Sequence, residues 1–211
     1  MTVAAQWLNS NFADFDLAFT LLVHRLYDLA GWFFSPLFEL LHILASPLGC
    51  TFLLLFLFFF VKKARPFIYA MMISVVLGVL FNNFVIKLLV ARPRPYVDEG
   101  SVFYQLWMMM GCHTESDLSF PSGHATGAFA MMLPIFLLGD KRRSWLALVY
   151  AFLVMISRVY LVVHYPTDVI AGAVVGTLAA LIGTPISQKL PRVLYTFEFF
   201  PKKQQGKHIK Q

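Results

Sequence analysis

Five long apolar runs restrict the folding of this chain more than any other feature. They cover residues 40–61, 67–90, 120–138, 145–163 and 167–186. Each run is close to the ~20 residues with which an α-helix crosses a hydrocarbon core of ~30 Å. A bilayer interior offers no water to backbone polar groups, so a helix that pairs them internally is favoured. The sequence therefore predicts an all-α fold, a polytopic membrane helix bundle that forms a single domain over residues 1–211.

The composition excludes the main soluble classes. The chain is 59% hydrophobic and 13% charged, with a mean hydropathy of +0.70, whereas a soluble domain averages roughly a quarter charged residues. The net charge of +6 would point to nucleic acid in a soluble protein. Here the Lys and Arg residues stand mostly at the ends of apolar runs, where they orient helices in a bilayer. The predicted partners are thus the lipid bilayer and a membrane lipid, not nucleic acid.

A sixth segment, residues 16–36, is less clear because His24, Arg25 and Asp28 interrupt it. It either spans the membrane or lies in the interface. Spanning is the favoured alternative, and it gives six transmembrane helices with both termini on the same side.

The basic clusters orient the bundle. VKKAR, DKRR and the basic tail at about 190–211 alternate with the other connections and so share one side. The positive-inside rule makes that side cytoplasmic. The opposite, extracytoplasmic side then receives the long connection at about 92–119 and the turn at 164–168. Arg92 and Arg94 lie on the side where the rule does not place cations, which suggests a role other than topology.

Two polar clusters flank the long connection. Lys87 and Arg94 are either boundary cations with snorkelling side chains or two donors that converge on an anion. Ser122 and Gly123 follow a proline at the predicted start of a helix, where free backbone N–H groups and the helix dipole favour a phosphate. An ordinary capped helix start is the alternative, but it leaves His124, just inside the membrane boundary, without a reason.

A third cluster closes the fourth apolar run. Arg158 lies deep enough in its span to require a polar partner. His164 follows six residues later, and the proline after Tyr165 ends the helix. Asp168 falls in the first turn of the next helix, where a carboxylate is favoured, and it can reach back to the His164 imidazole.

The three clusters map to one side of the membrane and together fit phosphoryl transfer. Three cations and helix N–H groups neutralise a phosphate, a histidine held by a carboxylate is an oriented nucleophile, and a second histidine can protonate the leaving group. Two histidines and an aspartate could also ligate zinc, but the three cations beside them disfavour a metal ion. The sequence therefore predicts a hydrolase with no metal and no cofactor.

Three ordered motifs resemble the signature of the type 2 phosphatidic acid phosphatase (lipid phosphate phosphatase) superfamily, in particular its bacterial membrane-bound members. They are Lys87-x6-Arg94-Pro95, Pro121-Ser122-Gly123-His124 and Ser157-Arg158-x5-His164-x3-Asp168. The resemblance implies a six-helix membrane fold with the site at the extracytoplasmic surface of the cell membrane, and it implies activity without a metal.

The resemblance also implies residue roles. His164 would attack phosphorus to give a phosphohistidine, Asp168 would orient it, and His124 would protonate the leaving group. The phosphoryl oxygens would be held by Lys87, Arg94, Ser122, Gly123 and Arg158.

The motifs are expected to bind the phosphate, and they do not determine which lipid carries it. Undecaprenyl diphosphate is the favoured substrate, in carrier-lipid recycling for cell-wall biogenesis; the alternatives are phosphatidylglycerol phosphate, phosphatidic acid and lipid A phosphates. A different class also stays open, a phospholipid-binding or transport protein without catalysis. The oligomeric state is not predicted.

Several other residues have expected roles in packing. Asn82 and Asn83 are expected to form interhelical hydrogen bonds, and Gly172 and Gly176 are expected to permit close helix packing. Cys50 and Cys112 could both lie near the outer face; free thiols are favoured over a disulfide between them.

Overall fold

The structure is a computed structural model that describes residues 1–191 and 193–196. Most of the predicted basic tail, residues 192 and 197–211, lies outside the described residues. In the described part all regular structure is helical and no strand occurs, which confirms the predicted all-α class.

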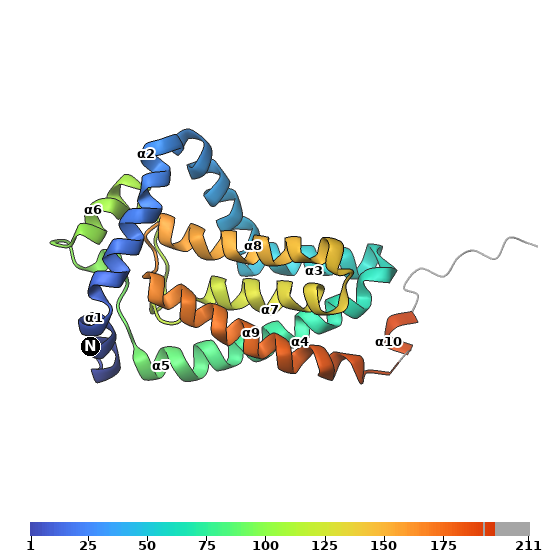
Figure 1. Cartoon of the computed structure of the whole chain (residues 1–211). Coiled ribbons are helices and arrows are strands. Elements are labelled where there is room, and N and C mark those ends of the chain that lie inside the picture. Colours follow the sequence, from blue (N-terminus) through green and yellow to red (C-terminus); the bar gives the residue numbers. More distant parts are fainter. Residues whose placement is uncertain (192, 197–211) are drawn as a thin grey trace, which may run out of the picture.

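Ten α-helices and three short helical segments follow one another along the described chain (Figure 1). The α-helices are α1 Val3–Asn11, α2 Ala13–Leu44, α3 Pro47–Phe60, α4 Arg65–Phe81, α5 Lys87–Val90, α6 Val102–Met109, α7 Gly123–Leu138, α8 Lys141–Tyr160, α9 Pro166–Gln188 and α10 Val193–Thr196. The short segments are the 3-10 turns η1 Lys62–Ala64 and η3 Pro95–Val97 and the π-helical turn η2 Asn82–Ile86.

Three helical stretches in the described residues are long and apolar enough to cross a membrane. They are Lys62–Val90, Lys141–Tyr160 and Pro166–Gln188, and a fourth results if α2 and α3, which meet at a bend of 66°, form one broken span. The apolar helix α7 has 16 residues, fewer than a full span requires. The six predicted spans therefore remain a prediction.

The α2–α3 region differs most from the sequence prediction. Two segments, 16–36 and 40–61, were expected, but α2 continues to Leu44 and α3 begins only at Pro47. The boundary lies at Ser46 and Pro47, because the Ser46 side chain caps the new helix and proline suits its first position. Hydropathy does not change at this point, so an apolar-run criterion places the boundary too early. Within α2 the backbone is kinked at Ala30, which has φ −158° and ψ 57°.

Helix α7 lies at the centre of the bundle and packs against α4, α8 and α9 (Figure 1). Gly172 and Gly176 let α9 approach α7 closely: a Cβ at Gly176 would lie 2.3 Å from the Thr126 carbonyl oxygen. Asn82, at the start of η2 after α4, links this region to α7, since it accepts a hydrogen bond from Thr126 and donates one to the Pro121 carbonyl. The interhelical expectations are thus confirmed for Gly176 and Asn82, whereas the Asn83 side chain accepts a hydrogen bond from its neighbour Asn82. Cys50 and Cys112 are both free thiols, as expected.

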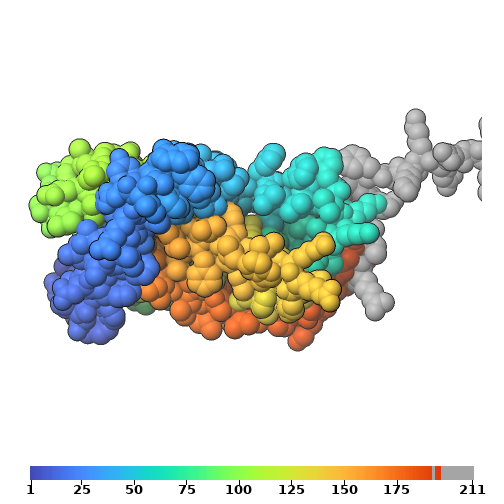
Figure 2. Space-filling model, turned by 45° about the horizontal axis from the view of Figure 1, so that its top comes forward, coloured from blue at the N-terminus to red at the C-terminus, as the bar shows by residue number. Residues whose placement is uncertain are grey.

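One end of the bundle collects the chain segments that carry the predicted motifs. The end of α5, the starts of α7 and α9 and the end of α8 meet there, next to α1 and α6 (Figure 1). The space-filling view shows the N-terminal helices and the α6 region packed together over this end, with α3 and α4 extending away from it (Figure 2). Motifs 80 residues apart in sequence are therefore neighbours in space.

Candidate active site

Lys87 and Arg94 converge on one point at the end of the α4–α5 stretch. A left-handed residue, Ala91 with φ 49°, ends α5 and turns the chain so that Arg94 points back towards the bundle. Both side chains are almost fully buried. Both form ion pairs with the carboxylate of Asp117, from the long connection. The two side chains therefore converge, on a carboxylate of the chain itself.

Arg94 also joins this cation pair to the histidine of the third motif. Its Nη1 donates to the Val163 carbonyl at 2.7 Å and lies 3.2 Å from His164 Nε2. Because a guanidinium only donates, Nε2 accepts here and the ring proton resides on Nδ1. Burial and the nearby Arg94 and Arg158 charges lower the pKa of His164 well below its ordinary value. A neutral ring with a free Nε2 electron pair beside the cations is the form that a nucleophilic histidine needs.

The other edge of His164 faces Ser119 and Asp168. The Asp168 Oδ2 atom lies 3.7 Å from His164 Nδ1, accepts from the Ser119 hydroxyl at 2.5 Å and accepts from the Tyr165 N–H at 2.9 Å. Ser119 Oγ is itself 3.5 Å from Nδ1. The sharp corner forms because α8 ends at Tyr160 and α9 begins at Pro166. The structure therefore brings Asp168 to His164, as expected, and adds Ser119 between them.

The start of α7 differs in two respects from the prediction. Ser122 is the N-cap and Gly123 the first helical residue, so Pro121 lies outside the helix and not in its first turn. The Ser122 N–H was expected to be free for a phosphate, but it donates to the Asp168 carbonyl at 3.0 Å and ties α7 to α9. Gly123 and His124, by contrast, line the cavity described below, which makes the first helical turn the anion-facing part.

Arg158 stands in the last turn of α8, fully buried, with partners that the sequence did not indicate. It forms an ion pair with Glu115 of the long connection and a hydrogen bond with His42 Nδ1 from the end of α2. His124 lies beside them: its Nδ1 is 3.9 Å from Glu115 Oε1, and its ring centroid is 5.4 Å from that of His42. The buried Nε2 of His124 has no hydrogen-bond partner among the described residues.

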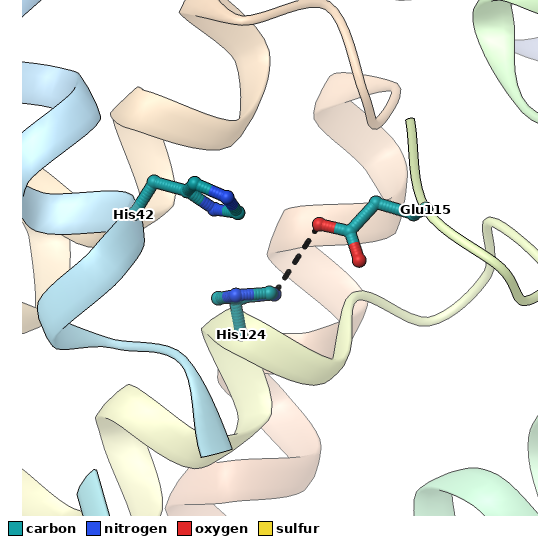
Figure 3. A group of neighbouring side chains, drawn as sticks. All are labelled: His42, Glu115 and His124. Atoms are coloured by element: carbon teal, nitrogen blue, oxygen red, sulfur yellow. Dashed lines mark ion pairs between the residues drawn. The ribbon is translucent and has the colours of Figure 1, made fainter. Parts of the chain in front are cut away.

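His42, Glu115 and His124 also have the spacing of a metal site (Figure 3). One ligand atom of each lies within 4.8 Å of the others, and two imidazoles with a carboxylate suit zinc. However, the Arg158 guanidinium already binds both Glu115 and His42. A cation at this point would meet a buried positive charge, so the donor set suits a metal but its surroundings do not.

The loop acids are the main feature that sequence reasoning missed. Asp117 pairs with Lys87 and Arg94, and Glu115 pairs with Arg158. Burial raises the pKa of Asp117, but hydrogen bonds and charges from Lys87 and Arg94 lower it overall. Each of the three predicted phosphate-binding cations thus holds a carboxylate of the connection at about 92–119. Only the acidic content of the segment 113–118 hinted at this.

A cavity of about 430 Å³ opens from this cluster between α3, α4 and α7. Its polar end is formed by side chains from all three motifs, namely Lys87, Arg94, His124 and His164. Its walls are apolar, with Leu54, Val75, Val79 and Met131 among the lining residues. A second, almost wholly apolar pocket of about 330 Å³ adjoins it between α3 and α4 and shares Thr51, Leu54 and Val75.

Fold and site define a membrane protein with a buried, cationic, histidine-containing pocket at one end of an apolar helix bundle. Residues 63–192, more than half of the chain and including every predicted site residue, match the family described as the PAP2 superfamily. The chain therefore belongs to this superfamily.

Three curated relatives show the range within it. The chain is 43% identical over 91 residues to the bacitracin transport permease protein BcrC of Bacillus licheniformis (43% of this chain, 44% of the relative). It is 30% identical over 148 residues to a lipid A 4'-phosphatase of Bacteroides thetaiotaomicron (69% and 64%). It is 30% identical over 107 residues to the undecaprenyl-diphosphatase BcrC of Bacillus subtilis (49% and 49%). The chain thus matches between about half and two thirds of the length of these relatives.

Proposed function

We propose that this protein is a membrane lipid phosphatase that hydrolyses a lipid phosphate or diphosphate through a phosphohistidine. Membership in the PAP2 superfamily and phosphatase relatives support the class. The observation that carries the proposal is the cavity: its polar end holds Lys87, Arg94 and two histidines, while its walls are apolar. Such a space fits a molecule with an anionic head and a hydrocarbon tail.

In the first chemical step His164 acts as the nucleophile. Its Nε2 electron pair attacks the terminal phosphorus, and the bond between that phosphorus and the leaving-group oxygen breaks; the leaving group is the lipid alcohol of a monophosphate or the lipid monophosphate of a diphosphate. The cations Lys87, Arg94 and Arg158 stabilise the charge on the phosphoryl oxygens. These oxygens replace the carboxylates of Asp117 and Glu115 as partners of the cations. His124 supplies a proton to the departing oxygen.

The second step returns the enzyme to its resting form. Water attacks the phosphohistidine, the P–N bond breaks, and inorganic phosphate leaves with His164 restored. His124, which gave its proton in the first step, accepts one from the water. Asp168 and Ser119 hold the imidazole, and no step requires a metal or a cofactor.

Undecaprenyl diphosphate is the substrate we propose first, with undecaprenyl phosphate and inorganic phosphate as products. Relatives in Bacillus subtilis and Sulfolobus acidocaldarius carry the name undecaprenyl-diphosphatase, and the adjoining apolar groove between α3 and α4, which shares Val75 with the cavity, suits a long prenyl tail. The second candidates are lipid A, phosphatidylglycerol phosphate and phosphatidic acid, since relatives named lipid A 4'-phosphatase and phosphatidylglycerophosphatase B also match.

Transport without catalysis is the alternative class, and one relative is named a transport permease. A transport path requires polar groups across the membrane. The second part of α3, LLLFLFFF, and the second half of α7, MMLPIFLL, provide none. Phosphate release from a purified sample separates the classes, since a transporter leaves the lipid intact while a phosphatase releases phosphate from one of the candidate lipids.

We also propose the cell membrane as the location, with the site on the extracytoplasmic side. The placement of VKKAR and DKRR supports this orientation. Labelling of Cys112, an exposed thiol of the long connection, by a membrane-impermeant maleimide in intact cells tests it. Labelling supports the orientation, and protection until lysis contradicts it.

A further inference from the structure

Arg92, the first arginine of the RPRP stretch, is not used by the mechanism and is fully buried. It does not face the cavity. Its Nη1 donates to Asp168 Oδ1 at 2.7 Å and to Thr167 Oγ1 at 2.7 Å, and its Nη2 donates to Asp16 Oδ2 at 2.8 Å. Its Nε donates to Asn9 Oδ1 at 2.7 Å. All three guanidinium nitrogens therefore have oxygen partners.

Asp16, at the start of α2, is the second buried carboxylate on this guanidinium. It is 1% exposed, and it accepts from the Thr167 N–H and hydroxyl, both at 2.9 Å. A buried carboxylate with an arginine and two further donors is a fully paired group. The N-terminal segment is thus joined, through Arg92 and Thr167, to the first turn of α9.

The geometry gives this network a defined effect on Asp168. Arg92 holds Oδ1, so that Oδ2 is turned to Ser119, Tyr165 N–H and the Nδ1 edge of His164. The charges also matter: one guanidinium between two carboxylates leaves a net negative charge beside His164. That charge favours the imidazole when its ring becomes positive on phosphorylation.

We infer that Arg92 and Asp16 are positioning residues for the His164–Asp168 pair, and that the N-terminal segment thereby completes the active site. This inference rests on the proposed function for its kinetic part. Neither residue touches the substrate cavity, so both act on kcat through Asp168 and leave phosphate binding to Lys87, Arg94 and Arg158.

Kinetics of Asp16→Asn and Arg92→Lys provide the first test. We expect kcat to fall about 10- to 100-fold, the range typical of groups that orient a reacting residue, with KM and inhibition by orthovanadate changed less than about threefold. Asp14→Asn, the same exchange at an exposed position two residues away on α2, should behave as wild type. Unchanged kcat in both variants, or equal loss of kcat and of vanadate inhibition, overturns the inference.

A double-mutant cycle separates positioning from general destabilisation. If Asp16 acts through Asp168, Asp16→Asn should cost little further kcat in an Asp168→Asn background, because the group that it orients is already lost. Additive losses in the double variant would indicate an independent structural role and contradict the inference.

The third readout needs no turnover and so distinguishes failure of this inference from failure of the proposed function. Nitrogen-15 histidine NMR of the full chain in detergent reports which ring nitrogen of His164 carries the proton, with His164→Gln identifying the signal. We expect the Nδ1–H form in wild type and a mixture of both forms in Asp16→Asn and Arg92→Lys. An unchanged Nδ1–H signal in both variants overturns the inference. If the two variants show the expected NMR change but the wild type hydrolyses none of the lipids, the proposed function alone is overturned.

Discussion

At the scale of single residues, the carboxylates of Glu115 and Asp117 form ion pairs with the cations that we propose bind the phosphate. Asp117 is about half exposed, with 49% of its side chain accessible, and it lies on the open side of Lys87 and Arg94. Its lowered pKa keeps it ionised at neutral pH. A phosphate that enters the site therefore competes with this carboxylate.

Removing that competitor should tighten anion binding. For Asp117→Asn we expect the inhibition constant for orthovanadate to fall by up to about fivefold, because partly exposed ion pairs contribute about 0.2–1 kcal/mol. Asp98→Asn, at an exposed acid of the same connection, is the matched control. Unchanged or weaker vanadate inhibition in the Asp117 variant would show that the carboxylate does not compete.

The protonation of His164 yields a second prediction at this scale. Burial and the charges of Arg94, Arg158 and Lys87 destabilise the imidazolium and lower the pKa of His164, so the neutral ring persists below the ordinary value of about 6.5. An NMR titration of the free protein should place its midpoint below 6.5, and Arg94→Gln should raise that midpoint. A wild-type midpoint at or above 6.5 would contradict the described environment.

Sequence reasoning identified only part of the site. The motif cations, both histidines and Asp168 follow from their chemistry and spacing, and the structure brings them together. His42, Ser119, Asp16 and the loop acids reach the site from outside the motifs, and only tertiary packing places them there. Sequence reasoning also predicted a feature that the structure lacks: the Ser122 N–H was expected to be a free donor at a helix start, but it donates to the Asp168 carbonyl in α9.

At the scale of elements, the contact of α7 with α9 holds two of the three motifs in register. A Cβ at Gly176 would lie 2.3 Å from the Thr126 carbonyl oxygen and 2.9 Å from Phe129 Cβ. Backbone atoms cannot move aside as a side chain can. Gly176→Ala should therefore destabilise the protein by about 1–3 kcal/mol, seen as a lower thermal midpoint in detergent.

Gly127→Ala is the matched control for that exchange. Gly127 lies inside α7 with nothing within 4 Å of its Cβ position, and alanine favours a helix interior by up to about 1 kcal/mol. Its thermal midpoint should equal or exceed that of the wild type. Equal stability of both variants would show that the close α7–α9 approach is not tightly packed.

The elements were predicted from sequence with uneven success, for a physical reason. Helices α4–α5, α8 and α9 lie close to the predicted runs because hydropathy, charge and proline change together at their ends. The α2–α3 boundary at Ser46 and Pro47 falls within continuous apolar sequence, so only capping chemistry marks it. The kink at Ala30 has no sequence signal that we can identify.

At the scale of the whole molecule, the polar cavity between α3, α4 and α7 adjoins the second pocket, an apolar groove between α3 and α4. Val75 lines both parts. If a lipid tail occupies the groove, Val75→Trp should raise KM for a long-chain lipid phosphate about tenfold or more and leave hydrolysis of a short, water-soluble phosphate ester unchanged. Val174→Trp, on the exposed face of α9, should alter neither. Equal effects on both substrates would contradict a tail site in this groove.

The most direct test of the central claim is phosphate release by the purified protein in detergent with EDTA present. Undecaprenyl diphosphate, phosphatidylglycerol phosphate, phosphatidic acid and lipid A are each compared beside His164→Ala. We expect release from at least one lipid, undecaprenyl diphosphate first, and its loss by several orders of magnitude in the variant. Release that survives in His164→Ala would contradict the assignment of His164 as nucleophile. Release abolished by EDTA would contradict a metal-independent site. A folded wild type that releases no phosphate from any of the four lipids would contradict the phosphatase proposal itself.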